Sequence, residues 1–168
     1  QRSLGFFFPG AELRALGHSD GDDDSAPLVL RYRFRAPRLC RPRSGAAGGG
    51  TELVFSAPFP ALLGRRYVGV PQRSTPLLLR YALPTELTAD VTLPSGAQAR
   101  VLRPGVDLRG YGVFAQTVTT TPGHLQLTTR FAMPIQRVEP ARYRDLVGFA
   151  TALDAAEDAA ALITLGER

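Results

Sequence analysis

The sequence has few of the residue types that catalytic and membrane proteins need. Its 168 residues include no lysine, asparagine or tryptophan, and only one cysteine and two histidines. A single cysteine excludes a disulfide within the chain, and two histidines cannot supply a histidine-rich zinc site. No apolar run approaches the roughly 18 residues that a membrane-spanning helix requires. We therefore predict no membrane insertion, although 44% of the residues are hydrophobic.

The basic residues are all arginines, and they give the chain a net charge of +5. Lysine and asparagine use A-rich codons, so a GC-rich genome explains this bias without a nucleic-acid partner. The densest arginine group, at residues 31–43, partly alternates with Leu30, Tyr32 and Phe34. Such alternation is typical of a strand with one solvated face, and a patch for an anionic partner is the alternative. We predict no nucleic-acid partner.

The common catalytic and nucleotide-binding motifs are missing. No HExxH, CxxC or GxGxxG spacing occurs, and the one G-x-S-x-G spacing, at 17–21, runs into the acidic segment and is no strand-to-helix nucleophile elbow. Cys40 lies in RLCRPR, where arginines would lower the pKa of its thiol, but neither His18 nor His124 lies in a recognisable motif. Cys40 is therefore either a partly buried structural thiol or a nucleophile with a histidine partner. We predict that the chain is not an enzyme and has no cofactor.

An acidic segment, SDGDDDSAP, is predicted to be a loop because aspartate, glycine and serine favour turns. Asp20, Asp22 and Asp24 have the close spacing of the first ligands in a calcium-binding loop. The EF-hand pattern also requires glycine at position six and glutamate at position twelve, where this chain has Ser25 and Arg31. We predict a solvated turn and no metal site, with weak cation binding by the three aspartates as the alternative.

The strongest strand pattern is a hairpin over residues 111–133, with a Pro-Gly turn at its centre. In the register that this turn favours, Val118 lies opposite Leu127, and Phe114 lies opposite Phe131. Each arm then has one apolar face, which other elements must cover because an isolated hairpin is marginally stable.

The second arm of the hairpin also has a polar face. Gln126, Thr128 and Arg130 alternate there with the apolar residues. No exposed row of aromatic residues accompanies them, so the pattern does not indicate stacking on sugars or single-stranded nucleic acid. We predict that these three residues form an interaction surface.

Proline and glycine turns separate several further strands. A second hairpin is predicted at residues 86–102, with Val91 facing Ala99 across a Pro-Ser-Gly turn. One helical turn is predicted at residues 61–67. Residues 161–165 are either a helix end or a last strand. The other predicted strands are residues 3–8, 11–17, 28–36, 51–56, 67–70 and 76–83.

A helix is predicted near the C-terminus, at about residues 140–158. Pro140 suits a first helical position, and Tyr143, Leu146 and Leu153 share one face. The polar face carries carboxylates and not the basic residues of a membrane-surface helix, so we expect packing on a sheet. These carboxylates are Asp145, Asp154, Glu157 and Asp158.

These elements predict a mainly β fold, an antiparallel β-sandwich with one C-terminal α-helix. The sandwich is predicted as one domain over residues 1–168, with flexible loops at about 19–27 and 42–50.

The C-terminal half contains short motifs in a recognisable order. Arg73 precedes a PLLL strand at 76–79, and a Leu-Pro-x-Gly turn at 93–96 precedes the long hairpin. An I-x-x-x-x-P-x-x-Y-x-x-L-x-x-F segment at 135–149 then opens an acidic, alanine-rich helix. This order resembles the C-terminal β-domain, a domain of unknown function, of bacterial multidomain proteins with a transglutaminase-like core of the papain-like superfamily.

The resemblance implies a non-catalytic accessory or interaction domain, with the preceding transglutaminase-like domain of the same polypeptide as its partner. It also implies a periplasmic or cell-envelope location. The core's Cys-His-Asp triad has no counterpart here, and Cys40 lies outside the similar region at 73–165. The alternative function is a carbohydrate- or peptide-binding β-sandwich module.

Overall fold

A computed structural model describes residues 7–18, 30–36, 39–43, 51–80 and 84–165. The chain forms two compact units, Gln1–Leu39 (unit 1) and Cys40–Arg168 (unit 2). The predicted single domain over residues 1–168 depends on how these units associate, and it stays a prediction.

Unit 1 contains one antiparallel strand pair, β1 (Glu12–His18) and β2 (Leu30–Arg35). The arginines of β2 are exposed, as expected for a strand with one solvated face. The ring of Phe34 lies 5.1 Å from that of Phe8, between centroids. The predicted strand at 3–8 is wrong at Phe7 and Phe8, which are helical and bent before a Pro-Gly turn, and its other residues lie outside the described ranges.

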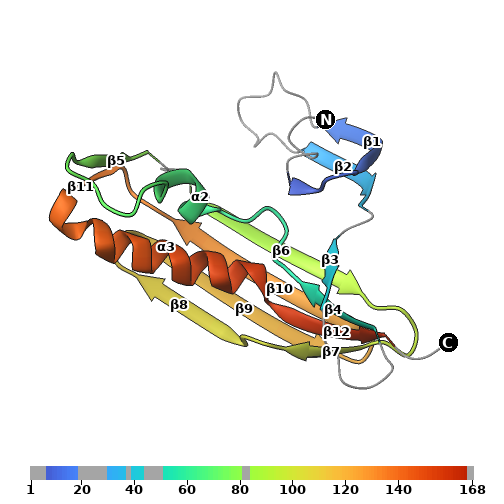
Figure 1. Cartoon of the computed structure of the whole chain (residues 1–168). Coiled ribbons are helices and arrows are strands. Elements are labelled where there is room, and N and C mark those ends of the chain that lie inside the picture. The colour runs from blue at the N-terminus through green and yellow to red at the C-terminus, as the bar shows by residue number, and fades with distance from the viewer. Residues whose placement is uncertain (1–6, 19–29, 37–38, 44–50, 81–83, 166–168) are drawn as a thin grey trace. The chain divides into compact units, whose positions relative to one another are not determined.

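The largest element of unit 2 is an antiparallel sheet in the order β6-β10-β9-β8 (Figure 1). The predicted register of the long hairpin is confirmed: Val118 lies opposite Leu127, and Phe114 lies opposite Phe131. The alternation of apolar and polar residues fixes this register, because a slip by one residue would expose the apolar face. The four strands are β6 (Thr85–Thr92), β8 (Gly105–Arg109), β9 (Val113–Thr121) and β10 (His124–Ala132).

A second antiparallel sheet has the order β3-β4-β12-β7, and a short ribbon pairs β5 with β11. Residues 161–165 form a strand in this second sheet, which settles the two alternatives for that segment. The strands are β3 (Cys40–Pro42), β4 (Thr51–Phe55), β7 (Gln98–Val101) and β12 (Ala161–Leu165), with β5 (Leu77–Leu79) and β11 (Gln136–Val138) in the ribbon.

The helices of unit 2 are α2 (Leu63–Tyr67) and α3 (Tyr143–Asp158), and a 3-10 turn (Pro140–Arg142) precedes α3. The predicted helices at 61–67 and 140–158 are confirmed. The predicted strand at 67–70 is wrong, because its first residue closes α2 and the next three pair with no strand. Among the described helices, none has the length and apolar character that crossing a membrane requires.

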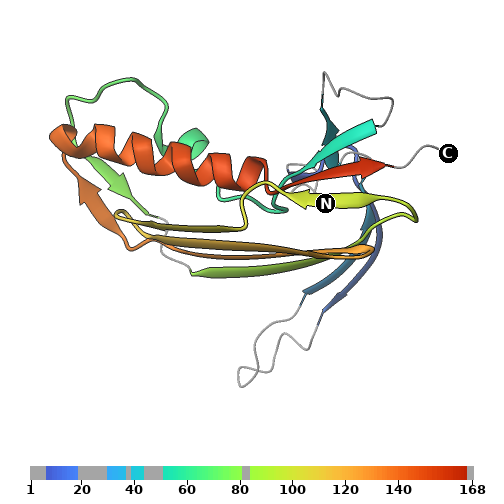
Figure 2. The ribbon, with the colours of Figure 1, turned by 90° about the horizontal axis from the view of Figure 1, so that it is seen from below.

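Two different layers cover the apolar face of the long hairpin (Figure 2). At one end, Phe114 and Phe131 pack with the apolar face of α3. At the other end, Val118 and Leu127 pack with residues of β4 and β12. Each such side chain contributes about 1.5–3 kcal/mol when fully buried. The predicted class, mainly β with antiparallel sheets and one C-terminal helix, is confirmed.

The predicted hairpin at 86–102 is wrong. β6 pairs with β10, so Val91 lies opposite Leu125, whereas β7 pairs with β12, so Ala99 lies opposite Ile163. The two strands therefore leave the Pro-Ser-Gly turn in different sheets. Both strands keep the predicted alternation, because alternation shows which face is buried without specifying which neighbour covers it.

Candidate functional site

The predicted interaction surface lies on the exposed face of the large sheet. The Gln126 amide donates a hydrogen bond to Asp90 at 2.7 Å, and the Arg130 guanidinium lies 3.0 Å from a carboxylate oxygen of Glu86. Thr128 is half-buried between its neighbours on β6 and β9. The structure thus brings the three predicted residues to one face, where two of them pair with β6. Exposed pairs of this kind stabilise a fold by about 0–1 kcal/mol.

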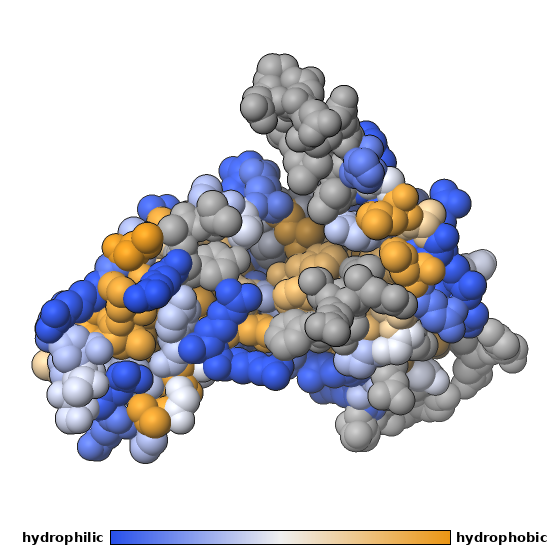
Figure 3. Space-filling model, turned by 90° about the horizontal axis from the view of Figure 1, so that it is seen from above, coloured by the Kyte–Doolittle hydropathy of each residue, from blue (hydrophilic) through white to orange (hydrophobic). Residues whose placement is uncertain are grey.

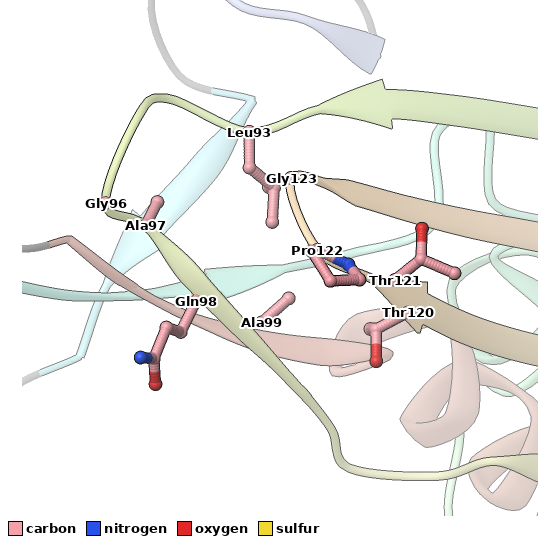
Figure 4. Close-up of a pocket in the computed structure, with 9 residues that line it drawn as sticks. All are labelled: Leu93, Gly96, Ala97, Gln98, Ala99, Thr120, Thr121, Pro122 and Gly123. Atoms are coloured by element: carbon pink, nitrogen blue, oxygen red, sulfur yellow. The ribbon is translucent and has the colours of Figure 1, made fainter.

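A pocket of about 510 Å³ lies where the β6–β7 and β9–β10 turns meet (Figure 4). The two turns are joined by a hydrogen bond from the Leu93 amide to the Gly123 carbonyl, at 2.8 Å. Thr120 and Thr121 point in opposite directions from β9, as successive strand residues do. None of the nine lining residues is charged, so this pocket has no acid or base for catalysis.

Two carboxylates near the C-terminal end of α3 hold the segment that leads into α2. Asp154 accepts hydrogen bonds from the backbone amides of Leu63 and Gly64, both at 2.9 Å. Glu157 accepts from the amide of Ala61 at 2.9 Å and is only 5% exposed. The N-terminal amides of a helix lack partners within the helix and attract negative charge. We call Asp154 and Glu157 the carboxylate clamp.

Two local features of the chain accompany the clamp around the start of α2. A Cβ atom on Gly64 would lie 2.6 Å from a carboxylate oxygen of Asp154, so glycine is needed for this approach. Phe59 and Leu62 have φ angles of 54° and 53°, in the left-handed region that other residues than glycine seldom adopt. Such strained residues persist where surrounding contacts fix the backbone.

The α3 carbonyl groups beside the clamp also have partners. The Ala156 carbonyl accepts from the side-chain amide of the buried Gln116, at 3.1 Å. The Glu157 carbonyl accepts from the Ala57 amide at 2.7 Å, and the Asp158 carbonyl accepts from Ser56 at the same distance. These bonds satisfy carbonyls that a helix end leaves open. The buried side-chain oxygen of Gln116 has no partner among the described residues.

Burial changes the ionisation of both clamp residues. Burial raises the pKa of Glu157 to about 7; the nearby Asp154 adds to this effect, and the amides of Ala61 and Leu62 oppose it. Burial also raises the pKa of Asp154, against the opposing bonds from Gly64 and Leu63. Both carboxylates serve the fold, so we assign them no catalytic role.

Glu157 is buried, so the prediction that it lies on the polar face of the helix is wrong. Glu157 continues the 3-4-3-4 spacing of Tyr143, Leu146, Ala150 and Leu153, all of which are buried. That spacing was the available signal. The spacing alone does not predict burial, because a carboxylate is seldom buried without partners and here the partner amide comes from a distant loop.

The other candidate site residues are Cys40 and the three aspartates of the acidic segment. Cys40 lies in β3 at half burial, and burial raises the pKa of its thiol, contrary to the lowering expected from nearby arginines. Asp20, Asp22 and Asp24 lie outside the described residues. Within the described ranges, no group of three or more His, Cys, Asp or Glu residues is arranged to hold a metal ion.

Comparison with known proteins gives one match. A family described as a domain of unknown function with a solved structure, DUF3858, matches residues 53–163. No curated protein and no solved structure matches the chain. The matched segment runs from β4 to β12 and includes α2, α3 and the clamp. The chain belongs to the DUF3858 family, a domain of unknown function.

Proposed function

We propose that the chain is a non-catalytic accessory domain that docks on a transglutaminase-like core of the same bacterial polypeptide, in the periplasm or cell envelope. The motifs at 73–165 support this proposal, and they fall almost entirely within the matched family segment at 53–163. The family description itself names no role.

An exposed apolar pair on the β5–β11 ribbon is the observation that carries the proposal. Ile135 is 62% exposed and Leu78 is 44% exposed. Leu78 lies opposite Arg137 in the ribbon, and Ile135 directly precedes β11, two residues before Arg137. Figure 3 shows hydrophobic residues among hydrophilic ones at this end of unit 2. An apolar centre with a polar rim is typical of an interface between proteins or domains.

The polar face with Gln126, Thr128 and Arg130 is the second docking surface in this proposal. Its pairs with β6 are solvated, so exchanging them for pairs with another domain costs little free energy. Interfaces between domains of one chain are also more polar than permanent ones.

The test measures binding between this chain and the separately produced core of its parent polypeptide. We expect Ile135→Asp to weaken binding at least tenfold, because it places a charge at the apolar centre. Leu102→Asp is the matched control, since Leu102 is 36% exposed and lies outside the ribbon. Arg130→Glu then tests the polar face. A parent polypeptide without a transglutaminase-like core, or equal binding by all variants, contradicts the proposal.

A carbohydrate-binding module is the weaker alternative. The pocket between the two turns has threonine hydroxyls, but none of its lining residues is an aromatic ring on which a sugar could stack. Glycan-array binding by the chain without any core would favour this alternative.

A further inference from the structure

A cavity of about 610 Å³ lies between the segment that precedes β5 and the start of α3. This volume is in the range of pockets that bind small molecules or peptide side chains. The two sides of the cavity come from parts of the chain that are far apart in sequence. The residues that matter are Pro71, Arg73, Pro140, Tyr143, Arg144 and Val147.

Arg73 is held in place within this cavity. Its guanidinium carbon lies 5.8 Å from the centroid of the Tyr143 ring, and its Nε donates to the Thr75 carbonyl at 3.5 Å. Tyr143 is itself fixed, because it is 3% exposed and its hydroxyl donates to the Val70 carbonyl at 2.8 Å. The terminal nitrogens of Arg73 have no hydrogen-bond partner in the described part of the chain. They are therefore available as donors to a ligand in the cavity.

Arg144 is the second cation of the cavity, and no described carboxylate pairs with it. Its neighbour Arg142 pairs with Asp145 at 2.7 Å, which leaves that acid engaged. None of the cavity's lining residues is acidic. The other arginines of unit 2 that have carboxylate partners are Arg41, Arg43, Arg109, Arg130 and Arg137.

The position of Arg144 adds to the excess positive charge. It is the second residue of α3, where the helix dipole is also positive. A cation at this end is therefore unfavourable for the helix. An anion in the cavity would lie near both guanidiniums and offset this unfavourable effect. Paired guanidiniums bind carboxylates through short, charge-assisted hydrogen bonds.

The other residues of the cavity determine which chemical group can bind beside the anion. Pro71, Pro140 and Val147 supply apolar walls next to the two cations. The chain from Pro71 to Thr75 is not in a strand or helix, and the backbone of Gln72 has no hydrogen-bond partner among the described residues. Free backbone groups beside an apolar pocket suit an extended peptide, whose own backbone pairs with them.

We infer that this cavity binds the carboxyl-terminal end of a peptide, with Arg73 and Arg144 holding the carboxylate and the apolar walls holding the last side chain. This site goes beyond docking on a core. Its binding is measured with the chain alone, so it can fail or succeed separately from the proposed function.

The test is fluorescence anisotropy with the full 168-residue chain and two labelled peptides. One is Gly-Ser-Gly-Ser-Ala-Leu with a free carboxyl end, and the other has the same sequence with an amide end. We expect saturable binding of the free acid and at least tenfold weaker binding of the amide, because the amide removes the charge that the guanidiniums hold.

Two variants and a control locate the site. Arg144→Glu and Arg73→Ala are each expected to weaken binding of the free acid at least tenfold. Arg144 is exposed, so we expect Arg144→Glu to fold. This variant keeps the test valid if Arg73→Ala disturbs folding through loss of the Arg73–Tyr143 contact. Arg103→Glu makes the same change in net charge at an exposed arginine outside the cavity, and it is expected to leave binding unchanged.

Four results overturn the inference. Equal binding of acid and amide shows that the carboxylate is not recognised. An equal loss with Arg103→Glu shows that net charge alone attracts the peptide. If inorganic phosphate displaces the peptide at phosphate concentrations below the dissociation constant of the peptide, the cavity is a simple anion site. Self-association that Arg144→Glu abolishes shows that a second copy of the chain is the partner.

Discussion

The two ends of α3 carry charges that oppose the helix dipole, yet the two ends differ in what those charges do. Asp154 and Glu157, near the negative end, are bound to the amides that lead into α2. Arg144, near the positive end, has no described carboxylate partner and lines an open cavity with Arg73. At both ends, a charge that the helix dipole disfavours is explained by a binding partner. Near the C-terminal end that partner is a segment of the same fold, and near the N-terminal end we propose that it is a bound peptide.

The largest expected effect comes from removing an arm of the clamp. Asp154→Ala leaves the part-buried amides of Leu63 and Gly64 without their acceptor, at a cost of about 1–2 kcal/mol for each donor. We expect the free energy of unfolding, measured by urea denaturation, to fall by about 2–4 kcal/mol. An unchanged midpoint of urea denaturation would show that the clamp does not hold α2. The C-terminal end of α3 would then have no structural role for its carboxylates.

The pH dependence of stability also tests the clamp at the C-terminal end of α3. Glu157 has a pKa of about 7 in the folded chain against 4.5 ordinarily. Between these values the folded chain keeps a proton that the unfolded chain has lost, so stability falls as pH rises from about 4.5 to 7. Linkage puts the loss at about 3 kcal/mol. Urea titrations between pH 5 and 8 measure it.

Glu157→Gln should remove most of that slope, because glutamine does not titrate and keeps an acceptor for the Ala61 amide. Glu86→Gln, at an exposed ion pair, is the control and should leave the slope unchanged. An identical slope in the wild type and in Glu157→Gln would show that another group causes the dependence.

Two glycine substitutions test the close approach of Asp154. Gly64→Ala places a Cβ atom 2.6 Å from the carboxylate oxygen and should destabilise the chain by about 1–2 kcal/mol. Gly148→Ala, within α3 and in open space, should instead stabilise it by about 0.5–1 kcal/mol. Thermal unfolding of both variants measures whether each substitution lowers or raises the stability. Stabilisation by both would mean that the carboxylate moves away freely.

The smallest expected effect lies on the polar sheet face. Arg130→Glu breaks an exposed ion pair with Glu86 and should cost less than about 1 kcal/mol. Thermal unfolding at low and high salt measures this loss, which added salt should reduce. A loss as large as that of Asp154→Ala would show that the contrast between buried and exposed charges is wrong.

The sequence predicts the fold well where a pattern is local. The β9–β10 register follows from one turn and one alternation, as Val118 and Leu127 show. The α3 boundaries follow from Pro140 and the spacing of the apolar residues. The partners of β6 and β7 were not predictable in this way, because Val91 and Ala99 would be equally well buried against each other.

The sites were harder to predict because each joins distant segments. Arg73 and Arg144 become neighbours only through the packing of α3 against the chain before β5. The sequence around Glu157 suggests a surface residue, because the amide of Ala61 that binds its carboxylate lies in a distant loop. Strand β8 is not among the strands predicted from the sequence, although Val106 and Leu108 alternate with polar residues as in the other strands.

The most direct test of the central claim measures stability and peptide binding in both Asp154→Ala and Arg144→Glu. We expect Asp154→Ala to lower the free energy of unfolding by about 2–4 kcal/mol and to leave binding of the free-acid peptide within twofold of wild type. We expect Arg144→Glu to leave the free energy of unfolding unchanged or to raise it, because an acidic residue suits this end of the helix dipole, and to weaken binding at least tenfold. Equal effects of the two variants on both quantities would contradict the division of α3 into a structural end and a binding end.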